Sequence, residues 1–182
     1  MILLPTDFEI CQYGVTARFV NEGDAEFITK LRSDEKLGRY IHASNGDVEA
    51  QRKWIGEYKT REREGLEYYF IFLKDGIPYG LERIYNIDWT HLSFTTGSWI
   101  CEKGTNIDDA FLTSLITNEI AYDLLGLKIN IYDVRKENKH VLNFHRKIMC
   151  ALQYAETELD YLFISTPETR KNSKLKKYLG IK

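Results

Sequence analysis

The fold is decided by the stretch HLSFTTGSWICEKGTNIDDAFLTSLITNEIAYDLLGLKINIYDV, residues 91–134. Its first part, His91 to Ile100, predicts a β-strand. A helix that begins near Ile107 then carries apolar residues at three- and four-residue steps, and Gly126 is suited to end it in a left-handed conformation. Residues Lys128 to Val134 alternate as a second strand does. A strand, a helix and a strand joined by short loops predict a right-handed crossover between two parallel strands.

Strands connected by hairpins are expected to lead into this unit. Residues Tyr68 to Leu73 are apolar on both faces, which is typical of a strand in the centre of a sheet. The pair Asp75-Gly76 is a strong signal for a two-residue hairpin, and Ile77 to Ile87 is the expected return strand. With His91 to Ile100, these segments form a predicted antiparallel meander. The expected fold is therefore α/β, with a mixed central sheet flanked by helices.

The other expected elements fit the same sheet, and we interpret residues 1–182 as a single domain without repeats or linkers. The basic tail, about residues 167–182, is expected to be a loosely held terminal helix. The expected segments are a strand at Val15–Val20, helices at Ala25–Leu31, Val48–Glu64 and Asn138–Met149, a polar loop at His42–Asp47, and short strands at Leu152–Thr157 and Tyr161–Ser165.

Composition excludes several classes of protein. The chain has 43% hydrophobic and 29% charged residues, as an ordinary globular protein does. Its net charge of -2 gives no attraction to nucleic acid or to an anionic membrane, and no apolar stretch approaches the ~20 residues of a transmembrane helix. The three cysteines lack metal-ligand or CxxC spacing, which favours free thiols in a reducing compartment. We expect a cytoplasmic protein with no metal, no nucleic-acid partner and no membrane partner, and a homodimer is left open.

The loop from Lys103 to Asp108 leads from a strand into the N-terminus of the long helix. Free backbone N–H groups and the helix dipole favour a phosphate at such a position. Gly104 and Asn106 both tolerate the left-handed backbone angles that a cradle of N–H groups requires. The alternative is an ordinary strand-to-helix loop that is capped by Asp108 or Asp109.

The order of elements and this loop resemble the GNAT superfamily of acyl-CoA-dependent N-acetyltransferases, over roughly residues 13–165. In that family the two parallel strands splay apart, and an Arg/Gln-x-x-Gly-x-Gly/Ala loop holds the pyrophosphate of CoA. Lys103 matches the first position, whereas Asn106 and Asp108 replace the two glycines, and a carboxylate at Asp108 would be repelled by pyrophosphate unless it points away. The resemblance implies that CoA contacts Trp99, Ile100, Cys101, Lys103, Gly104, Thr105, Asn106, Ile107 and Asp108.

A second motif supports the same resemblance. The family places an Asn after the fifth strand and an aromatic-Tyr pair six residues on, and Asn138 with Phe144-His145 has this spacing. His145 takes the place of a Tyr that protonates the departing CoA thiolate, and an imidazole with a reference pKa near ~6.5 is partly protonated at neutral pH. The alternative is a surface histidine beside basic neighbours. The resemblance also implies that CoA contacts Asn138, Val141, Phe144 and Lys147.

The activity that the resemblance implies is direct transfer of an acetyl group from acetyl-CoA to an amine, without a covalent enzyme intermediate. An attacking ammonium must first lose a proton. Glu82 is our candidate for the general base; its alternative role is a salt bridge with Arg83. His91, acting through a water molecule, is a second candidate for the base. Backbone N–H groups of the strand His91–Ile100 would stabilise the developing charge on the thioester carbonyl.

The acceptor is suggested by two local stretches. Residues 97–100 and 133–139, with Phe144-His145, look like a subgroup that acetylates nucleotide-linked amino-dideoxy sugars for surface polysaccharides. A phosphate-bearing acceptor requires nearby cations, and Arg39, Arg83 and Arg135 are available. Two alternatives stay open. One is acetylation of a protein N-terminus, as in ribosomal-protein acetyltransferases, and the other is a CoA-binding module without catalysis.

Overall fold

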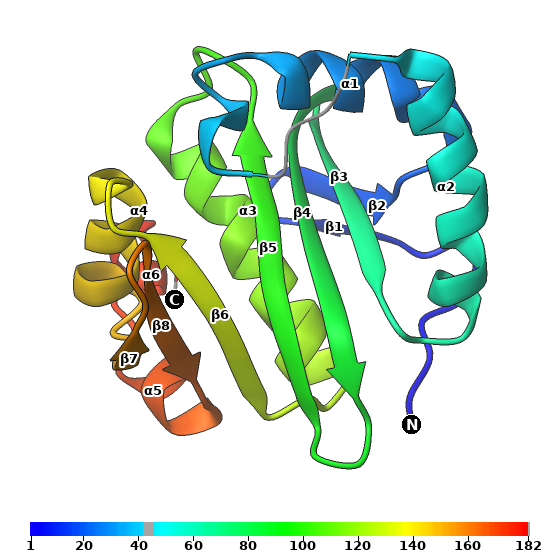
Figure 1. Cartoon of the computed structure of the whole chain (residues 1–182). Helices are drawn as coiled ribbons and strands as arrows, with labels where there is room; N and C mark the ends of the chain where they lie inside the picture. The colour runs from blue at the N-terminus through cyan, green and yellow to red at the C-terminus, as the bar shows by residue number, and fades with distance from the viewer. Residues whose placement is uncertain (42–45, 182) are drawn as a thin grey trace.

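The computed structural model describes residues 1–41 and 46–181, and its strands form one eight-stranded sheet in the order β1-β2-β3-β4-β5-β6-β8-β7. Helices α1 and α2 cover one face of the sheet and α3 covers the other (Figure 1). The strands are β1 (Glu9–Gln12), β2 (Val15–Phe19), β3 (Tyr68–Lys74), β4 (Ile77–Asp88), β5 (Ser93–Cys101), β6 (Ile129–Arg135), β7 (Leu152–Glu156) and β8 (Asp160–Ser165). The helices are α1 (Ala25–Ser33), α2 (Val48–Arg63), α3 (Ile107–Glu119), α4 (Lys139–Asn143), α5 (Pro167–Lys171) and α6 (Leu175–Tyr178).

The predicted meander is confirmed, because β3, β4 and β5 pair antiparallel in sequence order. Asp75 and Gly76 have φ angles of 51° and 78°, the left-handed pair that a tight hairpin requires. Strand β1 was not expected from the sequence; it pairs with β2 through a turn in which Tyr13 and Gly14 have φ angles of 55° and 76°. The expected loop 42–47 falls largely on residues 42–45, which lie outside the described part of the chain.

Strand β3 lies between two hydrophobic cores, as its apolar sequence predicted. Tyr68, Phe70 and Phe72 pack toward α3, whereas Tyr69 and Ile71 pack toward α1 and α2, and all five are fully buried. Successive side chains of a strand point to opposite faces, so a strand covered on both sides needs apolar residues at every position. This strand anchors the meander that carries the site.

Strands β5 and β6 run parallel and diverge, which confirms the predicted mixed sheet (Figure 1). Only their N-terminal ends pair, Ser93 with Ile129 and Phe94 with Asn130. At the point of divergence the Asn130 side chain accepts from the Thr96 backbone N–H and donates to the Thr96 hydroxyl, each at 3.0 Å. A side-chain amide thus replaces the backbone ladder where the strands separate, and a gap opens beyond it.

Strand β5 carries a bulge at this gap. Leu81 pairs with Ile100 and Arg83 with Gly97, so two residues of β5 stand opposite the single residue Glu82 of β4. Ser98, inside the bulge, has a left-handed φ of 53°. Such bulges bend a strand and leave one residue out of the ladder, and they are frequent beside active sites. The irregular backbone therefore lies where the strands splay apart.

Both helices that border the gap end in widened π-helical turns, one at Ile120–Leu124 after α3 and one at Phe144–Ile148 after α4. The first is followed by Gly126 at a φ of 70°, which confirms the predicted left-handed cap. The second replaces the expected regular helix up to Met149. Single π turns are commonly found at functional sites, and this one carries the Phe144-His145 motif.

The C-terminal tail is packed, so the expectation of a loosely held helix is wrong. Leu175 is 2% exposed and belongs to a cluster with residues of α3 and with Phe144. Arg170 pairs with Asp123 at 2.5 Å and Lys176 pairs with Glu119 at 2.7 Å. Two of the basic residues of the tail therefore pair with acidic residues near the end of α3.

Candidate active site

A cleft of about 140 Å³ occupies the gap between the splayed strands. Strands β4, β5 and β6, the segment after α1 and the start of α4 contribute to it, so residues far apart in the sequence meet there. Its lining comprises Leu37, Tyr40, Ile41, Glu82, Thr96, Gly97, Ser98, Trp99, Tyr132, Asp133, Val134, Arg135, Asn138, Val141 and His145.

Glu82 places a buried carboxyl group in this cleft. The residue is 3% exposed, and its Oε2 atom has no hydrogen-bond partner among the described residues. Burial raises its pKa to about 8. The alternative salt bridge is wrong, because Arg83 pairs with Glu67 at 2.6 Å instead. A pKa near the working pH suits a group that must both accept and release a proton.

His145 lines the cleft and packs among aromatic rings, against Tyr132 on β6 and Phe163 on β8. Its Nδ1 atom is 2.9 Å from the hydroxyl oxygen of Tyr132. Removal from solvent lowers the pKa of His145 to about 3, so the imidazole is neutral at pH 7. The expectation of a partly protonated imidazole is therefore wrong, because the solvent reference value does not hold in apolar surroundings. The alternative of a surface histidine is also wrong, since His145 lines the cleft.

A second hollow, apolar and about 420 Å³ in volume, adjoins the cleft on the side of α3 and α4. The two share the lining residues Trp99 and Val141, so they lie side by side near the end of β5. The lining of this apolar pocket comprises Trp99, Ile107, Ala110, Phe111, His140, Val141, Asn143, Phe144, Lys147, Ile148 and Tyr178.

The loop before α3 differs from its sequence-based description at Asn106. This residue has a φ of -69°, not a left-handed angle, and its side-chain oxygen accepts from the Asp109 backbone N–H at 2.8 Å. Asn106 is therefore the helix cap, in place of Asp108 or Asp109. Asp109 pairs with Lys74 at 2.7 Å, whereas Asp108 is exposed. Gly104 is the residue of this loop that takes a left-handed φ, 94°.

The predicted site residues separate into groups. Glu82, Asn138 and His145 line the cleft, Ile107, Phe144 and Lys147 line the apolar pocket, and Trp99 and Val141 line both. Lys103, Gly104, Thr105, Asn106 and Asp108 form the loop at the N-terminus of α3.

Ile100 and Cys101 are placed differently from the rest of the predicted site. The Ile100 side chain is buried in the core beneath α1 and α2. Burial raises the pKa of the Cys101 thiol to about 12, as expected of a cysteine that is not a nucleophile. Neither side chain belongs to the lining of the two hollows in the described part of the chain, which leaves only their backbone for a role there.

Sequence reasoning missed many of the lining residues, among them Tyr132, His140, Asn143 and Tyr178. Tyr132 lies in an alternating strand, where an aromatic residue indicates core packing. Tyr178 lies in the basic tail, far from both motifs, and its only sequence signal was an isolated aromatic residue among lysines.

Residues 1–41 and 46–181 contain neither a membrane-spanning helix nor a cluster of metal ligands. Within these ranges no helix has the length and apolar character needed to cross a membrane. The same residues contain no group of three or more His, Cys, Asp or Glu that could hold a metal ion.

No family model and no curated protein matches the sequence, but solved structures do. FdhC, described as a nucleotide-linked sugar GNAT, superposes with a TM-score of 0.84 at 34% identity, over 97% of this chain and 99% of that one. The ribosomal-protein-S5-alanine acetyltransferase of Vibrio fischeri gives a TM-score of 0.75 at 12% identity, over 88% and 97%. Spermidine N-acetyltransferase of Vibrio cholerae, solved with CoA and spermine, gives 0.74 at 14%, over 88% and 100%.

A mixed sheet with one splayed parallel pair, and a cleft at the splay, define an acyl-CoA N-acyltransferase fold. With the identity to FdhC over nearly the whole chain, the protein belongs to the GNAT superfamily and is an acetyl-CoA-dependent N-acetyltransferase.

Proposed function

We propose that this enzyme acetylates the amino group of a nucleotide-linked amino-dideoxy sugar in the biosynthesis of surface polysaccharides, in the cytoplasm. The observation that carries the transfer chemistry is Glu82, a buried carboxyl group with a free oxygen in the cleft of the splayed strands. The observation that favours the acceptor is the 34% identity to FdhC, a nucleotide-linked sugar GNAT.

The two hollows fit acetyl-CoA, which supplies an activated acetyl thioester when bound. Ile107, Phe144 and Val141 offer apolar surface for its pantetheine chain, and the cleft that contains Glu82 adjoins this pocket at Trp99. The N-terminus of α3, capped by Asn106, offers backbone N–H groups to phosphate. Lys103, Gly104, Thr105 and Asp108 complete that loop. Lys147 lines the apolar pocket and Asn138 lines the cleft.

In this arrangement Glu82 accepts the proton that the amine releases as it attacks the acetyl carbon. The bulge of β5 opposite Glu82 leaves backbone N–H groups near Ser98 outside the ladder, where they stabilise the charge that develops on the carbonyl oxygen. His145, neutral in its aromatic surroundings, donates an N–H to the departing sulfur. A thiolate is a good leaving group, so a hydrogen bond suffices in place of a full proton transfer.

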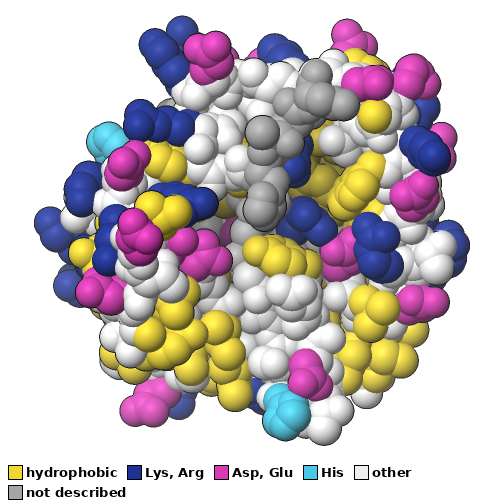
Figure 2. Space-filling model, viewed as in Figure 1, with side chains coloured by type: hydrophobic (Ala, Val, Ile, Leu, Met, Phe, Trp, Pro, Cys, Tyr) yellow, Lys and Arg dark blue, Asp and Glu magenta, His cyan; other side chains and the backbone are white. Residues whose placement is uncertain are grey.

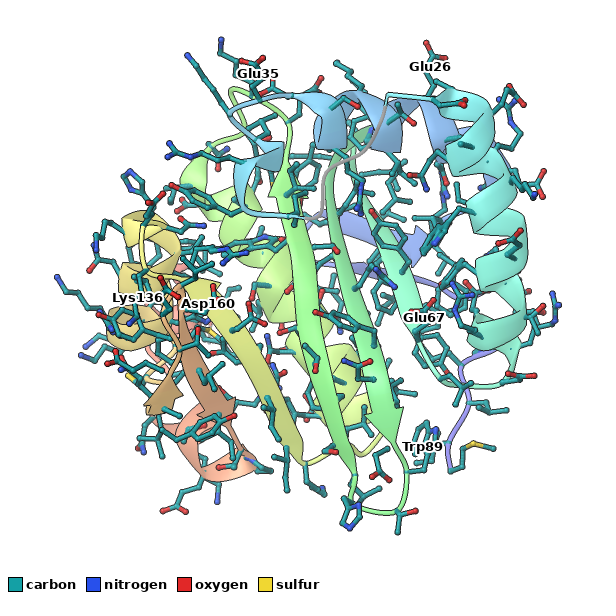
Figure 3. All side chains as sticks on the ribbon, viewed as in Figure 1. Glu26, Glu35, Glu67, Trp89, Lys136 and Asp160 are labelled. Carbon is teal, nitrogen blue, oxygen red and sulfur yellow. The ribbon has the colours of Figure 1, made fainter. Side chains whose placement is uncertain are left out.

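Cations for a diphosphate lie beside the cleft. A hollow of about 360 Å³ is lined by Arg39, Tyr40, Arg135, Lys136, Glu137, Glu158 and Leu159, and it shares Tyr40 and Arg135 with the cleft. Figure 3 labels Lys136 and Asp160 there, where β6 ends and β8 begins. In Figure 2, Lys and Arg side chains gather at the same left edge with Asp and Glu among them.

The ion pairs of this hollow are weak enough to be exchanged. Arg39 lies 3.2 Å from Glu137, and Arg135 lies 3.3 Å from Asp160, with much of each Arg side chain in solvent. Exposed pairs of this kind are worth ~0–1 kcal/mol, so a doubly charged ligand can replace them. Arg83, the third cation considered from sequence, is held instead by Glu67 and by the ring of Tyr85.

The test is release of free CoA with matched acceptors: a nucleotide-linked amino-dideoxy sugar, the same sugar without the nucleotide, spermidine, and a peptide with a free N-terminus. We expect turnover of the nucleotide-linked sugar and little of the others. Preferred turnover of the peptide would assign the ribosomal-protein type of activity. CoA binding without turnover of any amine would assign a non-catalytic module.

The Arg135→Gln variant refines the acceptor. We expect its KM for the nucleotide-linked sugar to rise roughly 10-fold, because a charge-assisted contact to phosphate is lost. Arg63→Gln, an exposed arginine in the last turn of α2, is the control with the same change of charge. Equal KM values in the two variants would remove this hollow from the acceptor site.

A further inference from the structure

A tyrosine and a histidine from different elements meet in the cleft. Tyr132 lies in the middle of β6, and His145 lies in the π-helical turn after α4. Their rings are 4.6 Å apart, and the Tyr132 hydroxyl lies 2.9 Å from Nδ1 of His145. Among the described residues, the His145 ring makes this hydrogen bond through Nδ1, and its Nε2 atom has no hydrogen-bond partner.

The direction of this hydrogen bond follows from the surroundings of the phenol. Tyr132 is 6% exposed, and a buried phenol needs an acceptor for its proton. Burial raises the pKa of Tyr132, so the hydroxyl keeps that proton, and the hydrogen bond of this hydroxyl that the structure shows among the described residues is the one with Nδ1 of His145. Nδ1 of His145 is then the acceptor that remains.

A neutral imidazole has one protonated nitrogen and one acceptor nitrogen, and a hydrogen bond at one of them selects the tautomer. His145 is neutral because it is removed from solvent. If Nδ1 accepts from Tyr132, the ring proton lies on Nε2.

We propose that Tyr132 is a positioning residue that holds His145 in the tautomer protonated at Nε2, with this N–H presented to the sulfur of the acyl donor. The proposal rests on the proposed function for the role of the N–H, but the tautomer itself is a property of the free protein. It explains how an uncharged histidine serves at a position where the family resemblance places a tyrosine: the hydroxyl is supplied from β6 and orients the imidazole.

The first experiment needs no substrate. Nitrogen-15 NMR of the protein labelled in histidine reports the protonation of each ring nitrogen, and His145→Phe assigns the signals by their loss. We expect one neutral tautomer, protonated at Nε2. A ring protonated at Nδ1 would overturn the proposal whether or not an acceptor has been found.

The second experiment uses Tyr132→Phe, with Tyr122→Phe as the control. Tyr122 is equally buried, and its hydroxyl donates to the Ser165 backbone oxygen instead of to His145. We expect Tyr132→Phe to mix the two tautomers and to lower kcat roughly 10-fold, as loss of a histidine's orienting partner does, with no change in the Kd of CoA. The control should change neither the His145 signals nor kcat.

The outcomes separate this proposal from the proposed function. An unchanged tautomer and an unchanged kcat in Tyr132→Phe would overturn the positioning role. A tautomer that mixes in Tyr132→Phe, in an enzyme that turns over none of the acceptors, would support the positioning role and overturn the proposed function alone.

Discussion

The cleft and the apolar pocket share Trp99 and Val141, yet burial affects different properties of the side chains in the two hollows. In the cleft, burial acts on titratable groups: it raises the pKa of Glu82 and lowers the pKa of His145. In the apolar pocket it acts on rings such as Phe144, which carry no charge to desolvate. The cleft therefore sets the pKa values of the groups that transfer protons, whereas the pocket supplies apolar contact area for a ligand. Substitutions in the first should change rate, and substitutions in the second should change affinity.

The largest effect is expected from Glu82→Gln, which keeps the shape of the side chain and removes the proposed base. It tests whether the cleft controls the rate. We expect kcat/KM to fall by ~100- to 10,000-fold, the usual contribution of a general base, while the Kd of CoA by calorimetry stays the same. Glu102→Gln, at the end of β5 but outside the lining of the cleft, is the control. A Glu82→Gln enzyme of full activity would assign the base to water, because His91, the second candidate from the sequence, pairs with Asp88 in the exposed turn between β4 and β5 and does not line the cleft.

The same variant should be more stable than the wild type at alkaline pH. The folded pKa of Glu82, about 8, lies above its ordinary value of 4.5, so its contribution to stability is full below pH 4.5 and is lost as the pH rises through 8. Glu82→Gln has no charge to bury, so its free energy of unfolding relative to the wild type should rise between pH 5 and pH 8, by on the order of 4 kcal/mol at most. Denaturant titrations at pH 5 and pH 8 measure it; an equal difference at both pH values would contradict the raised pKa.

For the apolar pocket the test is Tyr178→Ala. Tyr178 is 50% exposed and packs against Phe111 at a ring distance of 5.3 Å, so its removal uncovers the pocket with little loss of core. We expect the Kd of CoA to rise roughly 10-fold, or 1.4 kcal/mol, with kcat at saturation unchanged. Tyr154→Ala on β7, 55% exposed and outside both hollows, is the matched control. A similar Kd in both variants would exclude the tail from the CoA site.

The smallest effect is expected at the entrance of α3. Asn106→Ala removes the side-chain cap and should lower the free energy of unfolding by about 1 kcal/mol. Asp108→Gly leaves the cap intact and removes a negative charge near the expected phosphate, so it should weaken CoA binding less than Asn106→Ala does. Melting curves and CoA titrations of both variants decide this, and weaker binding by Asp108→Gly would require a different placement of the loop.

Elements with strong local signals were predictable from sequence. Asp75-Gly76 could form only a tight turn, and Gly126 suited only a helix end, and both take the left-handed angles that were expected. Asn106 shows the limit of such reasoning, because asparagine suits both a left-handed residue and a helix cap. Its φ of -69° shows that Asn106 is the helix cap and does not adopt a left-handed conformation. Strand β1 was missed because its turn uses Tyr13, a residue that rarely adopts a positive φ.

At the site, the positions of Glu82 and His145 could be predicted from the sequence, but the protonation state of His145 could not. Glu82 was expected at the cleft because of its strand and His145 because of the second motif, and both side chains line the cleft. The pKa of His145 depends on rings brought in from elsewhere, among them Phe163 on β8 and Tyr132 on β6. Tyr132 itself has the alternation of a core residue, and only the splay of the strands gives it access to the cleft.

The short pairing between β5 and β6 also bears on how the chain reaches its folded state. The hairpins of the meander close over a few residues, and β6 with β8 forms a ladder of its own, whereas β5 and β6 join through two residue pairs across the whole of α3. Contacts of large sequence separation form later than hairpins do, so we expect the two parts of the sheet to dock after the meander and the β6–β8 ladder have formed. The cleft exists only after that step. Asn130, which bridges the strands where the ladder stops, is then a residue whose loss would leave both parts folded and the enzyme inactive, without touching any group that handles a proton.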